Sequence, residues 1–494
     1  MTAITELPKT ATSVHRWRAF AVLAVAFFMT IVDLTIVNVA LPTIGRKLHF
    51  SETNLQWVVT AYGVAFGGFL LLGGRAADLL GRRRVLMVGL AVFTLASLAC
   101  ALATTDSFLI AMRGIQGLGA AIVLPAALSI VMNMFTEGAE RNKALGIWGG
   151  IGASGATVGL IAGGLLTRYL GWEYIFYLNV PVAALAFLLA PRIVPESRLD
   201  TTRRRFDLSG GITVTAGLLL LVYALSKAPQ DGWAAGSTIA LLAGAAALIA
   251  AFLVIETRVE APLMPLRIFR SRTLAGANAV GLLLGGSFFA FIFVGTLYMQ
   301  QVLGYSALKT GLAWLAASLT SIAFAGLSQA LVTRISAKLV MAFGMALIGG
   351  GILWATQVPV HGHLWNDLAG PFFVTGAGTA FAFIPVSIAG LAGVSEHEAG
   401  LASGLLNTSQ QIGGAIGVAV ASTVAATQFK ALTHAGATAP AALTGGFQWA
   451  MWVCGAVGLT AVPATFLLIR RNELAKAAAA MAAPTAEPVL AQAD

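Results

Sequence analysis

The sequence predicts an all-α polytopic membrane protein, and three observations support that fold class. Of its 494 residues, 58% are hydrophobic and only 10% are charged, whereas soluble proteins average about 25% charged residues. Apolar runs of about 20 residues, the length at which an α-helix crosses a bilayer core, recur from residue 18 to residue 469. Gly is abundant, at 55 residues, which suits close helix packing in membranes.

Fourteen apolar segments are expected to span the membrane. In order, they lie at 18–42, 54–74, 84–104, 108–132, 143–167, 173–191, 208–227, 236–256, 273–301, 308–332, 337–357, 367–392, 399–427 and 445–469. Two basic linkers, 191–207 and 256–272, divide them into groups of six, two and six. The prediction is two six-helix bundles with two inserted helices between them. A weak repeat, GRAADLLGRR from Gly74 and GLSQALVTRI from Gly326, favours two related bundles, a common transporter plan.

The predicted domain limits follow from this grouping. They are a cytoplasmic N-terminus at 1–17, an N-terminal bundle at 18–191, the linkers with their two inserted helices at 192–272, a C-terminal bundle at 273–469 and a cytoplasmic tail at 470–494.

The placement of Lys and Arg predicts the orientation of the helices. With the N-terminus inside, most of the 30 basic residues fall in inside loops. The outside loops hold Arg46, Lys47, Arg168, Lys227, Lys309 and Lys430. Basic residues prefer cytoplasmic loops, so both termini are expected in the cytoplasm and the protein in the inner membrane. The formal charge of +10 is therefore interpreted as membrane orientation rather than as a nucleic-acid surface. Cys100 and Cys454 lie in apolar segments, so no disulfide framework is expected.

Asp33 is the only one of the 20 acidic residues that lies well inside a predicted span. A carboxylate at that depth is expensive unless it is paired, protonated or functional. Arg113, the one basic residue deep in a span, lies about 8 Å from the outer end of its segment, and Asp33 about 13 Å from the outer end of its own. These depths allow the two side chains to meet. Gln116, one turn beyond Arg113, offers a neutral relay partner for a proton.

Two alternatives remain open for this pair. Asp33 is either a proton carrier or the acceptor of a structural hydrogen bond, for example from Arg113. Arg113 either has a functional role or extends its side chain to the outer interface.

The segment 73–84, GGRAADLLGRRR, is the most specific feature of the sequence. Gly81 allows a tight reversal between two spans. Asp78 can accept a hydrogen bond from a helix N-terminus and pair with Arg82 or Arg83. The alternative is a simple positive-inside loop.

The pattern G-x-x-x-D-x-x-G-R-R, which starts at Gly74, resembles the signature loop of the major facilitator superfamily. Other stretches resemble marks of its fourteen-helix drug:proton antiporter family of multidrug or natural-product exporters: Val32–Pro42, Leu109–Ala121, Gly155–Gly164, Trp172–Pro181 and Pro265–Arg272. Together they cover nearly the whole span region. The resemblance implies the major facilitator fold, and it implies that Arg113 faces the cavity and bonds to the first helix or its acidic group.

The chain departs from that family in the fifth span, where Leu160 stands in place of the usual Pro. A Pro would kink the helix. Without it, Gly155, Gly159 and Gly163 share one face of a straighter helix, followed by Gly164. Such a ridge of small residues predicts tight packing against the other half of the molecule.

The substrate cavity is expected between the two bundles, with segments 9 and 12 along one side. Aromatic walls suit flat lipophilic cations, although any single Phe is more often a core or lipid-facing residue. The candidate cavity residues are Asn38, Tyr62, Phe289, Phe293, Tyr298, Phe381, Asn407 and Gln410. No metal site is expected, because His361 and His363 lack an acid or Cys partner nearby.

We therefore expect proton-coupled secondary active efflux of a lipophilic, cationic drug or antibiotic, with Asp33 as proton carrier. The partners are the substrate, protons and the lipid bilayer, and the protein is expected to be a monomer that needs no cofactor beyond the proton gradient. No G-x-x-x-x-G-K-[ST] stretch and no catalytic constellation occurs, which argues against ATP-driven transport and against an enzyme. The alternatives are a dedicated exporter of a neutral or anionic natural product and a transporter-like sensor without flux.

Overall fold

The computed structural model describes residues 13–135, 139–196, 207–260, 262–264, 266–392 and 399–470. Residues 1–12, the linker part 197–206 and the predicted tail beyond residue 470 lie outside the described residues. Within the described ranges the secondary structure is entirely helical.

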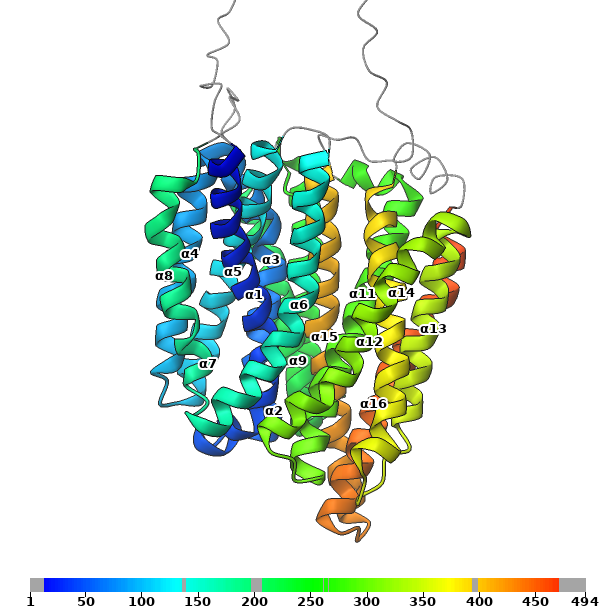
Figure 1. The fold of residues 1–494 in the computed structure, drawn as a ribbon. Helices are drawn as coiled ribbons and strands as arrows, with labels where there is room; N and C mark the ends of the chain where they lie inside the picture. Colours follow the sequence, from blue (N-terminus) through cyan, green and yellow to red (C-terminus); the bar gives the residue numbers. More distant parts are fainter. Residues whose placement is uncertain are drawn as a thin grey trace, which may run out of the picture.

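Fourteen helices of 15 or more residues make up the described fold (Figure 1). They are α1 (Ser13–Lys47), α3 (Trp57–Leu80), α4 (Arg82–Ala101), α5 (Asp106–Met134), α6 (Ala139–Tyr169), α8 (Asn179–Ile193), α9 (Leu208–Asp231), α10 (Gly236–Arg258), α11 (Arg272–Leu297), α12 (Ala307–Arg334), α13 (Ala337–Ala355), α14 (Ala369–Leu391), α15 (Ala399–His434) and α16 (Ala439–Leu468). Short turns add α2 (Glu52–Leu55), α7 (Tyr174–Tyr177), η1 (Leu266–Arg270), η2 (Tyr298–Val302) and η3 (Leu364–Leu368). Each predicted span coincides with one long helix, except that the sixth is divided between α7 and α8, the ninth runs from α11 into η2 and the twelfth begins in η3.

Length and composition make twelve of the described helical segments apolar and long enough to cross a membrane. The stretch Ser209–Leu225 of α9 is apolar as well. Large apolar side chains cover the outside of the helices. Leu95 of α4 is 66% exposed and Leu319 of α12 is 57% exposed. Such a surface is costly in water and fits a lipid environment.

Local sequence explains where several helices begin. The side chains of Thr105, Ser271 and Ser306 each accept a hydrogen bond from the backbone N–H three residues later. These N-caps start α5, α11 and α12, since the first turn of a helix leaves its N–H groups without partners in the helix itself.

The long helices pack in two groups. In the first, α3 packs on α5, α4 on α5 and α8, and α1 on α6 and α8. In the second, α11 packs on α15 and α16, α13 on α14 and α16, and α12 on α14. Figure 1 shows the first group at the left and the second at the right. We call the end where α1 begins and α16 ends the terminal side, and the end where α2 lies the far side.

The two groups meet along α3–α15 and along α6–α12. At the far side, the Gln300 side chain donates from Nε2 to the Val39 carbonyl at 2.7 Å, which joins η2 to α1. One continuous cluster of buried apolar residues includes the far-side part of α1 and most of the second group, whereas the terminal-side part of the first group has its own cluster. The halves therefore share their main core toward the far side.

The inserted helices lie on one edge of this seam. Helix α9 packs on both α3 and α15, and α10 packs on α9. Val64 of α3, Leu218 and Val222 of α9 and Ala415 of α15 form one buried cluster. The α15 residue Thr423 also donates from its hydroxyl to a carbonyl of α9 at 3.0 Å. Helix α9 thus contacts both halves at once.

Candidate functional site

Asp33 lies near the middle of α1 with its side chain fully buried. Arg113 of α5 donates from Nη1 to Asp33 Oδ2 at 2.7 Å and forms an ion pair with it. Gln116 donates from Nε2 to Asp33 Oδ1 at 2.9 Å, and Asn179 of α8 donates from Nδ2 to the same oxygen at 2.7 Å. The carboxylate therefore accepts three short hydrogen bonds from two neighbouring helices.

Arg113 is as deeply buried as its partner, with an exposed fraction of 0%. Its Nε donates to the Val58 carbonyl of α3 at 2.9 Å, and Nη1 also donates to Gln116 Oε1 at 2.6 Å. The guanidinium carbon lies 4.3 Å from the ring centre of Tyr62 and 5.7 Å from that of Phe176. Cation–π contacts of this kind stabilise a desolvated charge. The arginine does not extend to the outer interface in this arrangement.

Gln116 extends the cluster to a further helix. Its Nε2 also donates to Ser97 Oγ of α4 at 2.8 Å, and the Ser97 hydroxyl donates to the Phe93 carbonyl at 2.7 Å. The Cys100 thiol lies 3.8 Å from Gln116 Oε1. We call Asp33, Ser97, Arg113, Gln116 and Asn179 the Asp33 network. Through it and the Val58 carbonyl, five helices of the first group are joined.

The network is electrically balanced but not saturated. It contains one carboxylate and one guanidinium, so its net charge is zero when Asp33 is ionised. Arg113 Nη2 and Asn179 Oδ1 are buried without a hydrogen-bond partner among the described residues. A proton added to Asp33 would leave the Arg113 charge uncompensated in the interior, which is costly. The ion pair with Arg113 therefore exists only while Asp33 is ionised.

The glycines of α6 bring that helix against α1 at the level of Asp33. Three of them face α1: Gly155, Gly159 and Gly163. A Cβ at Gly159 would lie 2.8 Å from the Val32 carbonyl, and a Cβ at Gly163 would overlap the Ile36 carbonyl. The sequence predicted that this ridge packs against the other half. In the structure it packs against α1 of its own group, because that helix offers the carbonyl-lined surface that only a residue without a Cβ can approach.

A different face of α6 contacts the other half. A Cβ at Gly164 would lie 2.8 Å from the Ala307 carbonyl of α12, and Gly311 of α12 lies against the Leu160 carbonyl. Leu160, which replaces the usual Pro, thus lies inside an uninterrupted helix at a contact between the halves.

Gly81 forms the terminal-side reversal between α3 and α4 with φ of 107°, a conformation that favours glycine. A Cβ here would also lie 3.0 Å from Glu196 Oε1. Gly74, which lies in α3 about two helical turns before Gly81, packs against the Pro125 ring of α5.

The arginines after Gly81 contact the end of α8. The Arg83 backbone N–H donates to Glu196 Oε1 at 3.0 Å, and its guanidinium lies 3.7 Å from Glu196 Oε2. Arg84 lies 3.8 Å from the same oxygen, and Arg82 is buried. The predicted partner, Asp78, has a side chain outside the part of the chain that is described. Glu196 was not among the predicted residues, because it lies more than a hundred positions from the loop in sequence.

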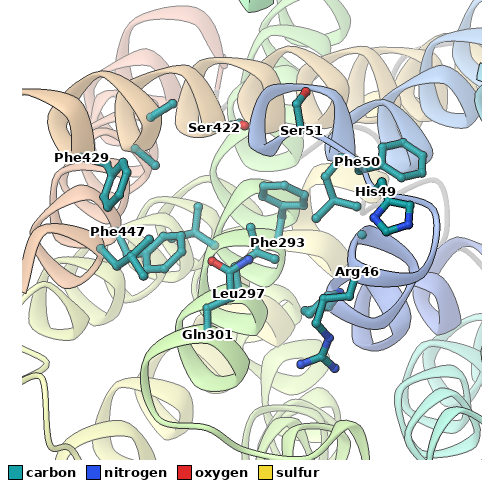
Figure 2. A pocket seen from close by; sticks show the side chains of 17 residues that line it. Arg46, His49, Phe50, Ser51, Phe293, Leu297, Gln301, Ser422, Phe429 and Phe447 are labelled. Carbon is teal, nitrogen blue, oxygen red and sulfur yellow. The ribbon is translucent and has the colours of Figure 1, made fainter. Parts of the chain in front are cut away.

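A cavity of about 450 Å³ opens between the halves on the far side. Figure 2 shows Arg46 and His49 of the α1–α2 region on one side of it and Phe429 and Phe447 of α15 and α16 on the other, with Phe293 of α11 between them. Of the predicted cavity residues, Phe293 lines this space.

A much smaller central space, about 20 Å³, lies between α1, α3, α11 and α15. Asn38 and Phe289, both predicted cavity residues, line it together with Gln411. Tyr62 belongs instead to the surroundings of the Asp33 network, beneath the Arg113 guanidinium.

The other predicted cavity residues lie elsewhere in the second group. Tyr298 is buried and donates from its hydroxyl to the Pro359 carbonyl at 2.6 Å. Phe381 packs in a cluster with two rings of α12 and α13, at centroid distances of 5.7 and 5.5 Å. Asn407 bonds within its own helix at 2.9 Å, and Gln410 is 9% exposed against α11. The structure does not bring these four residues to the two spaces just described.

Asn179 and Ser97 are the network residues that sequence reasoning missed. Asn179 lies in the stretch 172–181 that marks the family resemblance, so its position was visible but its direction was not. Ser97 had no distinguishing signal, since serines commonly bond within their own membrane helix.

Two packed groups of long apolar helices, the first of which encloses a buried ion pair, are the architecture of a multi-pass membrane protein. The chain belongs to the Major Facilitator Superfamily, whose family model matches residues 23–418. The predicted superfamily is thereby confirmed, and with it a multi-pass membrane protein.

Several relatives are resistance or export proteins. The chain is 38% identical to the puromycin resistance protein pur8 of Streptomyces alboniger over 483 residues, 96% of this chain and 95% of the relative. It is 37% identical to the cephamycin export protein CmcT of Amycolatopsis lactamdurans over 410 residues, 82% of this chain and 84% of the relative. The crystal structure of the POT family transporter PepTSo matches with a TM-score of 0.66 at 15% identity, over 91% of this chain and 98% of that chain, which shows a shared fold. Drug or antibiotic efflux is the function that these relatives support.

Proposed function

We propose that this protein exports a lipophilic drug or antibiotic across the cytoplasmic membrane in exchange for protons, with Asp33 as the proton carrier. The observation that carries the proposal is a carboxylate at the middle of a spanning helix, fully buried and held by Arg113, Gln116 and Asn179. Ionisable groups in such positions mark proton and ion pathways in membrane proteins. Resistance to puromycin and export of cephamycin, named for the relatives, support an antibiotic-like substrate.

The proposed arrangement in the membrane has fourteen spans, two bundles at 18–191 and 273–469, and the terminal side in the cytoplasm. The loop arginines at that side favour this orientation. The contacts from Gln300 to Val39 and from Gly311 to Leu160 join the halves near the far side. These contacts hold the halves together near the far side of a transporter that we expect to act as a monomer.

Proton coupling follows from the charge balance of the Asp33 network. While Asp33 is ionised, α1 is tied to α5 by the ion pair and to α8 by the Asn179 bond. Protonation removes the ion pair and leaves the Arg113 charge with the Val58 carbonyl and the Gln116 oxygen. The first bundle then has a different preferred packing, and that difference biases the rocking of one half against the other. One proton crossing with the membrane potential supplies about 2.3 kcal/mol per 100 mV, and no further cofactor is required.

Asp33 acts in this scheme without touching the substrate. Its side chain is buried within one bundle, and its hydrogen bonds run to α5 and α8 of the same bundle rather than to the space between the halves. The cationic substrate predicted from the sequence relied on competition between cation and proton at this carboxylate, and the buried position does not favour such competition. It favours the second candidate, a neutral or anionic natural product carried by the same proton cycle.

The decisive experiment is transport by purified protein in liposomes. With an acidic lumen, so that protons flow out of the vesicles, puromycin and a small panel of lipophilic compounds are tested for uptake into inverted proteoliposomes, with and without a protonophore. Gradient-dependent uptake that the protonophore abolishes is the expected result. Exchange of substrate without any response to the gradient would refute proton coupling. Absence of exchange for every compound would favour the sensor interpretation.

A further inference from the structure

The far-side cavity differs in chemistry from the Asp33 network and is spatially separate from it. Its residues come from both halves: the end of α1 and α2 on one side, and α11, α15 and α16 on the other. At about 450 Å³ its volume falls in the range of small-molecule sites, which begins near 300 Å³. A ligand here would contact both halves and would be affected by any movement between them.

One side of the cavity is an aromatic wall. Phe293, Phe429 and Phe447 come from three different helices (Figure 2). Phe293 is 1% exposed and Phe447 is 5% exposed, so packing holds both rings in place. Rings held in this way offer a preformed surface to a flat ligand at little cost in conformational entropy.

The opposite side carries the charge. Arg46 and His49 are exposed and line the cavity, and none of its seventeen described lining residues is an Asp or a Glu. An aromatic wall alone would accept a cation through its ring faces. A fixed positive charge without a compensating carboxylate among these residues works against that preference and attracts an anion.

We infer that this cavity is a second binding site, an exit site that takes aromatic compounds that are neutral or negatively charged and disfavours cations. Its role as an exit site rests on the proposed export function, whereas its selectivity rests only on the lining residues. The Phe wall supplies affinity through burial of the ring system. Arg46, and His49 when protonated, select the sign of the charge.

The test uses one ring system with three charges: 2-naphthoate, 2-naphthylmethanol and 2-naphthylmethylammonium. Each is titrated calorimetrically into purified protein in phosphatidylcholine nanodiscs, with empty nanodiscs subtracted. The anion and the alcohol should bind, and the cation should bind roughly tenfold more weakly than the anion, as expected for one nearby unit charge in a partly wet site. Equal or tighter binding of the cation would overturn the inference.

The charge-reversing variant Arg46→Glu locates the effect. It should weaken naphthoate binding roughly tenfold, strengthen binding of the ammonium compound by a similar factor and leave the alcohol unchanged. Arg168→Glu is the matched control, because Arg168 is an exposed arginine at the far-side end of α6 that does not line the cavity. Equal responses of the two variants would mean a general surface potential and would overturn the site. Phe293→Leu should weaken binding of all three compounds. Unchanged binding would show that the aromatic wall does not bind these compounds, and it would overturn the proposed site.

Two further arms separate the remaining possibilities. An anionic lipid shares the chemistry of a negative head on an apolar body, so the naphthoate titration is repeated in nanodiscs with phosphatidylglycerol. Loss of naphthoate binding there would assign the cavity to lipid and overturn the exit site. Transport is measured on the same protein preparation. Transport without charge-selective binding refutes this inference alone, whereas charge-selective binding without transport refutes the proposed function and leaves the binding site standing.

Discussion

Replacement of Asp33 by Asn tests the Asp33 network most directly. The two side chains have nearly the same shape, and the remaining carbonyl can still accept from Gln116 or Asn179. Arg113 Nη1, now 2.7 Å from Asp33 Oδ2, would instead meet an amide NH₂, a donor facing a donor. The substitution therefore removes the negative charge and leaves Arg113 charged and fully buried.

The structure sets the size of the expected effect. Removing one partner of a buried ion pair costs about 3–5 kcal/mol. The bonds from Arg113 to the Val58 carbonyl and to Gln116, and the Tyr62 ring 4.3 Å away, retain part of its stabilisation. We expect a loss near the lower limit, about 3 kcal/mol. The double variant Asp33→Asn/Arg113→Gln removes both charges and should recover stability, with a coupling energy of about 1–3 kcal/mol.

Two assays measure the consequences. Thermal unfolding of the purified protein in detergent should place the double variant above Asp33→Asn. In proteoliposomes, Asp33→Asn should lose gradient-driven transport down to the level of protein-free liposomes but keep substrate counterflow, which needs no change in protonation. Asp106→Asn is the control, since this carboxylate lies half-buried at the start of α5, outside the network.

Gradient-driven transport at the unmodified rate in Asp33→Asn would refute the proton-carrier assignment. If the double variant loses as much stability as the two single variants together, the two charges do not stabilise each other and the expected coupling energy of the ion pair is refuted.

Three further predictions address the helix contacts. Gly159→Ala forces a methyl group against Val32 and should lower stability by about 1–3 kcal/mol. Thermal unfolding measures this, and an equal effect of Gly350→Ala, where a Cβ meets nothing within 4 Å, would contradict the close-packing explanation. Glu196→Gln weakens the half-exposed contacts to the arginines after Gly81, so stability should change by less than about 1 kcal/mol, while turnover in liposomes should fall; unchanged turnover would reduce this loop to an orientation signal. Gln300→Ala removes the bond to the α1 carbonyl and should shift the population toward far-side opening roughly two- to tenfold. Distances between spin labels at the far-side ends of α1 and α12, measured by electron paramagnetic resonance, report that shift. A distance distribution identical to that of the unmodified protein would show that the Gln300 bond does not hold the far side closed.

The helices could be predicted from the sequence because each one coincides with a long apolar run. The contact between Asp33 and Arg113 could be predicted as well, since the depth of each residue in the membrane follows from the helical rise alone. Depth is a one-dimensional quantity, and a spanning helix with a single charged residue needs no other information to place that residue along its axis.

Direction around a helix axis was the quantity the sequence left undetermined. Helix α14 is apolar on every face, so nothing in its pattern distinguishes a ring that lines a cavity from Phe381, which packs among other rings. Asn179 follows a break in the chain at Gly171, with φ of 123°, and the separate turn α7, so the helical phase of α6 does not carry through to α8. The glycines of α6 specified a close approach but not which helix approaches.

The position of α9 has a mechanical consequence. It is bound to α3 and α15 by a shared apolar cluster and by the Thr423 hydroxyl, so it links the two bundles along one edge. A movement of one bundle against the other must therefore either carry α9 with one bundle or break its contacts to the other. We expect a cross-link between α9 and α15 to leave transport intact, whereas a cross-link between α6 and α12, where the halves meet directly, should block it.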